Sequence, residues 1–227
     1  MAVFPVFVEM DQRDCLIIGG GQVALRKIRI LLDAGAKVTV IGPSFCPELE
    51  QLASEGRIVC LPCETEYTLD FLKARLEQGM VPAFGICAAS DKQVNHEAAV
   101  FLKHSDVLVD SATETGDCDF FFPSVIRRDP VMVGISTGGQ APSVSRHLRR
   151  ILEAALPEWT GQWAERMKDI RRWVLDHVRE SRRKKLIQHM TSEIWNEYAQ
   201  QGKGTKAWSE RVCELERMAE SGEEDEI

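Results

Sequence analysis

The chain has 227 residues, of which 44% are hydrophobic and 28% are charged, a composition typical of a globular protein with one or two domains. Its net charge of −7 argues against nucleic acid as a partner, and no stretch reaches the roughly 20 apolar residues that a membrane span needs. Because the first residues lack a basic stretch followed by a long apolar one, we expect a cytoplasmic protein with no membrane partner.

A glycine-rich turn follows the first predicted strand. The strand is apolar from Leu16 to Ile18, and Gly19, Gly21 and Ala24 fit the spacing G-x-G-x-x-G/A of a dinucleotide-binding turn. A helical pattern then runs from Val23 to about Ala34, so the free N–H groups of its first turn would face a pyrophosphate. A simple strand-to-helix turn without a ligand is the alternative.

Strands and helices alternate from residue 14 to residue 113, which predicts an α/β fold with a Rossmann-like, doubly wound parallel sheet. After the first strand, the predicted strands lie in AKVTVIG, RIVCL, PAFGICAAS and DVLVDSA. Such sheets bind ligands beyond the carboxyl ends of their strands. We therefore expect Gly42–Ser44, Ala88–Asp91 and Asp110–Thr113 to gather around one crevice.

The end of the second strand bears on the choice of dinucleotide. NAD-binding folds usually carry an acidic residue there, but this chain has Gly42, Pro43 and Ser44. An arginine of the kind that binds the extra phosphate of NADP is also missing. We expect NAD, with a flavin as the competing dinucleotide.

The pattern changes after Thr113. Two short β-like runs flank a polar turn at Arg127–Pro130 and predict a small α+β segment whose aromatic face suits a dimer. Helical periodicity follows from Ser143, and the acidic end SGEEDEI is typical of a disordered tail. The predicted domains are 1–113 for the nucleotide, 114–150 for dimerisation, 151–202 as a helical domain and 203–227 as a disordered tail.

A second glycine-containing loop, Ser136–Pro142, opens a basic helix. Loop N–H groups and arginines on such a helix can bind carboxylates or phosphates. The arginines are Arg146, Arg149 and Arg150, with Arg127 and Arg128 nearby in sequence. The segment therefore predicts a site for a ligand with several negative charges, with an ordinary solvated helix as the alternative.

Candidate acid–base residues cluster after the fifth strand. Asp110, Asp117 and Asp119 could each act as a general base or simply cap a turn. His96, His104 and His147 lack ligand spacing, so we assign them no role. The seven cysteines fit reduced thiols, and since Cys60 and Cys63 have no second ligand pair, we expect no metal site.

Taken in order, several motifs resemble those of the precorrin-2 dehydrogenases, including the amino-terminal half of bifunctional siroheme synthases. They are FPVFVEMDQRDCLIIGGGQVALRK, AGAKVTVIGP, ICAASDKQVN, CDFFFPSVIRRDPVMVGISTGG and APSVSRHLRRILEAALP, between about residues 4 and 157. The resemblance implies a homodimer that uses NAD to oxidise precorrin-2, a tetrapyrrole rich in carboxylates, to sirohydrochlorin.

The resemblance also implies site residues. The implied NAD contacts are Gly19, Gly20, Gly21, Gln22, Val23, Pro43, Ser44, Ala89, Ser90 and Asp91. The implied substrate contacts are Ser136, Thr137, Gly138, Gly139, Arg146 and Arg149.

One departure from the family concerns catalysis. Many members read N-x-x-D at the end of the fifth strand, where this chain has Asp110 and Thr113. The carboxylate has moved to Asp110, been replaced by Asp117, or been lost. Similarly, Asp129 stands where a serine is common. We therefore expect dehydrogenation ahead of metal chelation, and a ferro- or cobaltochelatase and a non-enzymatic nucleotide sensor are the alternatives.

Overall fold

The computed structural model describes residues 3–64, 68–79, 81–201 and 207–220. The chain forms two compact units, and it passes between them more than once. The first unit contains residues 1–122 and 136–141, and the second contains residues 123–135 and 142–227. The predicted four-part division, with limits at residues 113, 150 and 202, stays a prediction.

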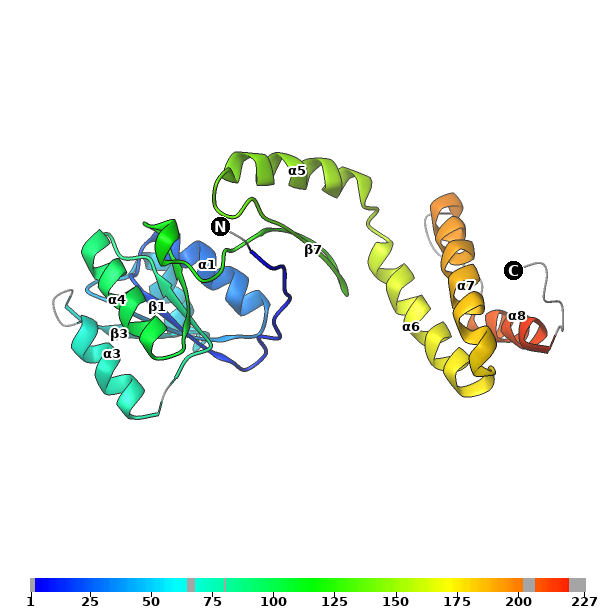
Figure 1. Ribbon diagram of the computed structural model, residues 1–227, viewed down its shortest axis with the longest axis horizontal. Coiled ribbons are helices and arrows are strands. Elements are labelled where there is room, and N and C mark those ends of the chain that lie inside the picture. Colours follow the sequence, from blue (N-terminus) through cyan, green and yellow to red (C-terminus); the bar gives the residue numbers. More distant parts are fainter. Residues whose placement is uncertain (1–2, 65–67, 80, 202–206, 221–227) are drawn as a thin grey trace. The chain divides into compact units, whose positions relative to one another are not determined.

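The first unit is a parallel sheet covered by helices on both faces (Figure 1). Its five strands have the order β3-β2-β1-β4-β5, and their bounds are β1 Asp14–Ile18, β2 Lys37–Gly42, β3 Val59–Pro62, β4 Phe84–Cys87 and β5 Leu108–Ser111. The helices are α1 Gln22–Asp33, α2 Pro47–Ser54, α3 Thr68–Glu77 and α4 Lys92–His104, and a 3₁₀ turn, η2, spans Thr115–Asp117. This order reverses at β1, so the predicted Rossmann-like fold is confirmed.

The central strand explains why the sheet forms. Side chains alternate along a strand, so Cys15 and Ile17 face the core under α1 and α2, while Leu16 and Ile18 face the core under α3 and α4. Each such buried aliphatic side chain contributes about 1.5–3 kcal/mol. Strand β1 is therefore buried on both faces.

The second unit combines a hairpin with helices. The antiparallel strands β6 Ser124–Arg128 and β7 Val131–Ile135 pair across a turn, and the helices are α5 Pro142–Ala155, α6 Thr160–His177, α7 Glu180–Gln201 and α8 Trp208–Glu220. A Cβ on Gly161 would lie 2.2 Å from the carbonyl oxygen of Asp129, so only glycine lets the start of α6 pack against the hairpin turn. An α+β segment followed by helices is confirmed.

Apolar side chains at helical spacing form the core of the second unit. Ile170 and Val174 of α6 pack against Met190 and Ile194 of α7, all fully buried. Trp159 lies against Trp195 with ring centroids 4.7 Å apart. The methionine and tryptophan side chains of this unit therefore serve packing.

Helix α8 lies within the range 203–227, for which we predicted a disordered tail. Arg211 is buried, with ion pairs of 2.6–3.0 Å to Glu193, Glu197 and Glu214, and Leu215 packs into the helical core. The prediction relied on the acidic composition of the range. It overlooked Arg211 and Leu215, which lie four residues apart and therefore share one face of the helix. The residues SGEEDEI, 221–227, lie outside the described residues.

Among the described residues, no helix combines the length and apolar character required to cross a membrane.

Arg211→Met removes the cation from the glutamates while keeping most of the side-chain volume. We expect the free energy of unfolding of the second unit to fall by about 1–3 kcal/mol, since buried charge-assisted hydrogen bonds are lost. All five tryptophans lie between residues 159 and 208, so tryptophan fluorescence during urea unfolding reports on this unit. The control is Arg217→Met at an exposed position of the same helix. Equal midpoints for the two variants would contradict a stabilising role of Arg211.

Candidate nucleotide site and the end of strand β5

The glycine turn between β1 and α1 is held from both sides. The N–H group of Gly19 donates to the carbonyl oxygen of Ile41 at 2.8 Å. Gly19 has φ +107°, and a Cβ there would lie 2.4 Å from the carbonyl oxygen of Ala88. A Cβ on Gly20 would lie 2.1 Å from the carbonyl oxygen of Ser44. These two glycines are therefore required by the protein's own backbone.

Gly21 differs from its two neighbours. It has φ −92° at the N-terminus of α1, a conformation open to any residue. A Cβ on Gly21 would meet no atom of the described residues within 4 Å. Folding does not require glycine here, but close approach of a pyrophosphate to the backbone does. The turn thus fits a dinucleotide.

The segment after β2 lies against the glycine turn. The N–H group of Cys46 donates to the carbonyl oxygen of Gly20 at 2.8 Å, which brings Pro43 and Ser44 beside the turn. The Gln22 amide lies 3.3 and 3.4 Å from the two carboxylate oxygens of Glu48, in the first turn of α2. A backbone N–H group at this helix start, and then Gln22, lower the pKa of Glu48.

Sequence reasoning found no acidic residue at the end of β2 and overlooked Glu48. The sequence did contain a signal for Glu48, because it is an acidic residue in the first turn of α2, the helix that follows β2. Gln22 and Val23, the other expected cofactor residues, begin α1, and both are exposed.

The end of β4 is fixed by a buried amide. Asn95 is fully buried and forms two hydrogen bonds with Ala89, accepting from its N–H group at 2.8 Å and donating to its carbonyl at 2.9 Å. Asp91 accepts from the N–H groups of Gln93 and Val94, which caps α4. The segment Ala89–Asp91, expected to bind the cofactor, is thus tied to the start of α4.

Asp110 of β5 points into the core. Its carboxylate forms an ion pair with the ammonium group of Lys27 of α1, and both side chains are buried. The Lys27 ammonium group also lies 5.0 Å from the centroid of the Phe122 ring. Removing one partner of such a pair costs about 3–5 kcal/mol, because the other charge stays buried. The candidate base Asp110 therefore neutralises a buried lysine.

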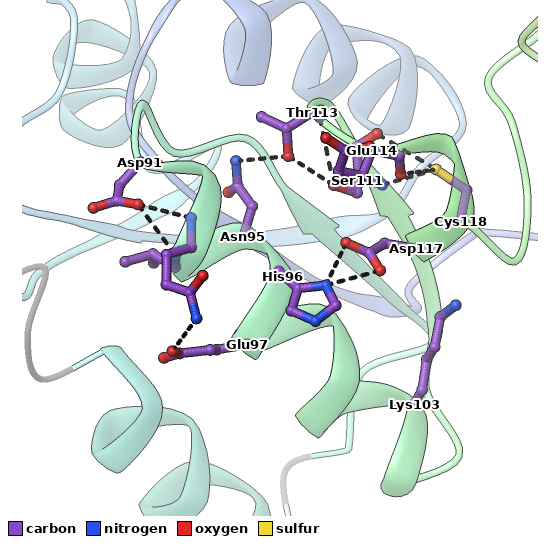
Figure 2. A network of polar contacts seen from close by, with 12 residues as sticks. Asp91, Asn95, His96, Glu97, Lys103, Ser111, Thr113, Glu114, Asp117 and Cys118 are labelled. Atoms are coloured by element: carbon purple, nitrogen blue, oxygen red, sulfur yellow. Dashed lines mark hydrogen bonds and ion pairs between the residues drawn. The ribbon is translucent and has the colours of Figure 1, made fainter.

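The other candidates after β5 have different partners (Figure 2). The Thr113 hydroxyl lies 3.2 Å from the Ser111 hydroxyl and 3.5 Å from the Asn95 amide. Asp117 of η2 pairs with His96 of α4 at 3.0 Å, and Asp119 pairs with Lys103 at 3.2 Å. Thr113, Asn95 and the His96–Asp117 pair lie at the same edge of the sheet as the glycine turn.

Burial raises the pKa of three cysteines near the site. Burial, and then the charges of Asp110 and Asp117, raise the pKa of Cys87 to about 12. Burial likewise raises the pKa of Cys60 and of Cys63. All seven cysteines are free thiols. In the described part of the chain, no three histidine, cysteine, aspartate or glutamate side chains gather as a metal site would require.

The expected substrate residues fall in two units. The loop Ser136–Gly139 belongs to the unit of the nucleotide turn, and a Cβ on Gly139 would lie 2.9 Å from Phe121 and 3.3 Å from Thr115. This loop therefore packs beside η2. Arg146 and Arg149 lie on α5 of the second unit, where Arg149 pairs with Glu153 at 3.1 Å.

Known proteins resemble this chain along most of its length. The siroheme synthase of Nitrosomonas europaea is 35% identical over 165 residues, covering 73% of this chain and 33% of the relative. That of Neisseria meningitidis serogroup C is 37% identical over 186 residues, covering 81% and 37%. The chain spans about a third of the length of these curated relatives, and they confirm the resemblance found in the motifs.

A solved structure described as "SirC, precorrin-2 dehydrogenase" aligns with a TM-score of 0.68 at 22% identity, covering 95% of this chain and 98% of that one, so the two share a fold. The family model described as "Putative NAD(P)-binding" matches residues 6–124, which contain the glycine turn, the Asn95 clamp and the end of β5. Because this match covers more than half of the chain, the protein belongs to that NAD(P)-binding family, as the glycine turn and the bare backbone at Gly21 indicated.

Proposed function

We propose that the protein oxidises precorrin-2 to sirohydrochlorin, with NAD as the acceptor of the hydride. The proposal rests on how much of the chain is similar to siroheme synthases. That similarity covers 73–81% of the chain and so extends beyond the NAD(P)-binding segment. The fold shared with a structure described as a precorrin-2 dehydrogenase supports it. The nucleotide-sensing alternative has no comparable observation in its favour, and Thr113 at the position of the family's aspartate favours dehydrogenation over metal chelation.

The glycine turn and its neighbours hold the dinucleotide in this proposal. Gly19–Gly21 and the start of α1 bind the pyrophosphate, and Pro43 and Ser44 lie beside them. Ala89 and Ser90 are positioned by the Asn95 clamp, and Asp91 acts as the cap of α4. Bound NAD supplies the hydride acceptor, and the reaction yields sirohydrochlorin, NADH and a proton.

Charge favours NAD over NADP. The stretch from Gly42 to Gly56 contains no lysine or arginine that could bind a 2′-phosphate. Glu48 lies close to Gln22 at the glycine turn, and its carboxylate would repel that phosphate.

The substrate is a polyanion, and the loop Ser136–Gly139 is proposed to contact it. Two glycines with positive φ, Gly138 at +61° and Gly139 at +77°, shape this loop. Packing of Gly139 beside Thr115 keeps the loop at the end of β5. Arg146 and Arg149 of α5 are proposed as substrate contacts on the resemblance to the family.

A homodimer is part of the proposal. Val144, Leu148, Ile151 and Leu152 share one face of α5, and each is 40–53% exposed. Four exposed aliphatic side chains on one helix favour burial against a second surface. We assign that surface to a second copy of the chain. We also assign the protein to the cytoplasm, where free thiols such as those of its cysteines persist.

Activity is tested with the purified full chain, NAD and freshly prepared precorrin-2. We expect NADH absorbance to rise together with the sirohydrochlorin spectrum, in equal molar amounts. A reaction without NADH formation at any NAD concentration would contradict the dehydrogenase proposal.

Gly21→Val tests the dinucleotide site. Because a Cβ there meets no atom of the described residues within 4 Å, we expect an unchanged circular dichroism spectrum. Binding of NADH, followed by its fluorescence, should weaken at least tenfold, or about 1.4 kcal/mol, since the side chain would occupy the space of the pyrophosphate. Gly20→Val should instead destabilise the fold, because its Cβ would overlap the Ser44 carbonyl oxygen. Undiminished NADH binding by Gly21→Val would place the cofactor elsewhere.

Ile151→Glu tests the dimer. A charge on the apolar face of α5 should convert a dimer into a monomer, as measured by light scattering with size-exclusion chromatography. The control is Leu175→Glu, a comparably exposed aliphatic position on α6 of the same unit, which should remain dimeric. A monomeric wild-type protein would reject this part of the proposal.

A further inference from the structure

His96 and Asp117 form a pair that sequence spacing did not suggest. His96 lies in the first half of α4, and Asp117 ends η2, 21 residues later. The ring nitrogen Nδ1 lies 3.1 and 3.0 Å from the two carboxylate oxygens. The His96 side chain is 53% exposed and that of Asp117 14%, so the carboxylate is mostly enclosed while the ring reaches solvent.

This pair is connected to the nucleotide turn by buried contacts. Asn95, the residue before His96, holds both backbone groups of Ala89 and lies 3.5 Å from the Thr113 hydroxyl. Ala88, the residue before Ala89, contacts Gly19 of the turn. The Asn95 amide thus ties the start of α4, where His96 lies, to the end of β4 beside the glycine turn (Figure 2).

The carboxylate sets the tautomer of the histidine. An ionised carboxylate can only accept hydrogen bonds, so the proton of a neutral His96 ring lies on Nδ1. Nε2 then keeps its lone pair. Within the described residues, Nε2 forms no hydrogen bond, so it is free to take a proton from a bound molecule.

Several charged groups near the pair have other partners. Asp91 caps α4, and the Glu97 carboxylate accepts from the Gln93 amide at 2.6 Å. Lys103 pairs with Asp119, and Lys27 pairs with Asp110. Asp117 differs from these groups because its partner, the His96 ring, can itself accept a proton.

We infer that His96, oriented by Asp117, is the catalytic base of the proposed dehydrogenation. NAD held at the glycine turn would accept the hydride, together with both electrons of the substrate C–H bond that breaks. A second substrate hydrogen leaves as a proton to Nε2 of His96, and the electron pair of its bond stays in the substrate to form the new double bond. Asp117 stabilises the imidazolium until water takes the proton. In this proposal, the His96–Asp117 pair takes the place of the aspartate that many family members carry at the position of Thr113.

The inference rests on the proposed function and is tested in the same assay. His96→Gln and Asp117→Asn should each lower kcat, the former by about a hundredfold, while NADH binding stays within twofold of wild type. Because the two residues act as a unit, the double variant should be no slower than His96→Gln. His104→Gln is the matched control: its ring lies on the same helix, bonded to the Val100 carbonyl, and should leave kcat unchanged.

Chemical rescue separates a catalytic role from a structural one. Added imidazole should restore turnover to His96→Ala and leave the wild type unaffected, because only a lost proton acceptor can be replaced from solution. An inactive wild type would reject the proposed function, and this inference with it. An active wild type whose His96→Gln variant keeps more than half its kcat would overturn the inference alone. A slow His96→Ala variant without imidazole rescue would also overturn it.

Discussion

The close approach of Gly19 to the backbone of Ala88 is the constraint on which the candidate site depends. It joins the ends of β1 and β4, while the hydrogen bond from Gly19 to Ile41 joins β1 to β2. No side chain fits there, so the strand ends meet closely enough for one ligand to contact all of them. Asn95 extends the arrangement to Thr113 and thus to the end of β5.

Burial divides the acidic residues after β5 by role. Asp110 is enclosed with Lys27, and the two charges stabilise each other because neither can reach water. Asp117 lies nearer the surface, beside a histidine that does reach solvent. Under the proposed reaction, the first holds α1 against the sheet, and the second works through the histidine. A difference of seven residues in sequence thus separates a packing role from a chemical one.

Most of the fold follows from local pattern. Short apolar runs predicted the strands of the sheet, and helical periodicity from Ser143 onward predicted the helices of the second unit. Pattern alone did not reveal which apolar stripes stay exposed: Val144, Leu148 and Ile151 on α5 have the same spacing as a buried stripe. Pattern also missed α8, because the overall acidic composition of residues 203–227 does not show that Arg211 is buried among glutamates.

The sequence by itself determined the glycine turn, the parallel α/β fold and the nucleotide-binding family, because each depends on residues close together in the chain. Only the tertiary structure decided which side chain each carboxylate pairs with. Lys27 and Asp110 are 83 residues apart and His96 and Asp117 are 21 apart, so their pairing depends on strand order and on the rotation of each helix over the sheet. Spacing along the chain does not encode that rotation, which comes from the packing of the whole core.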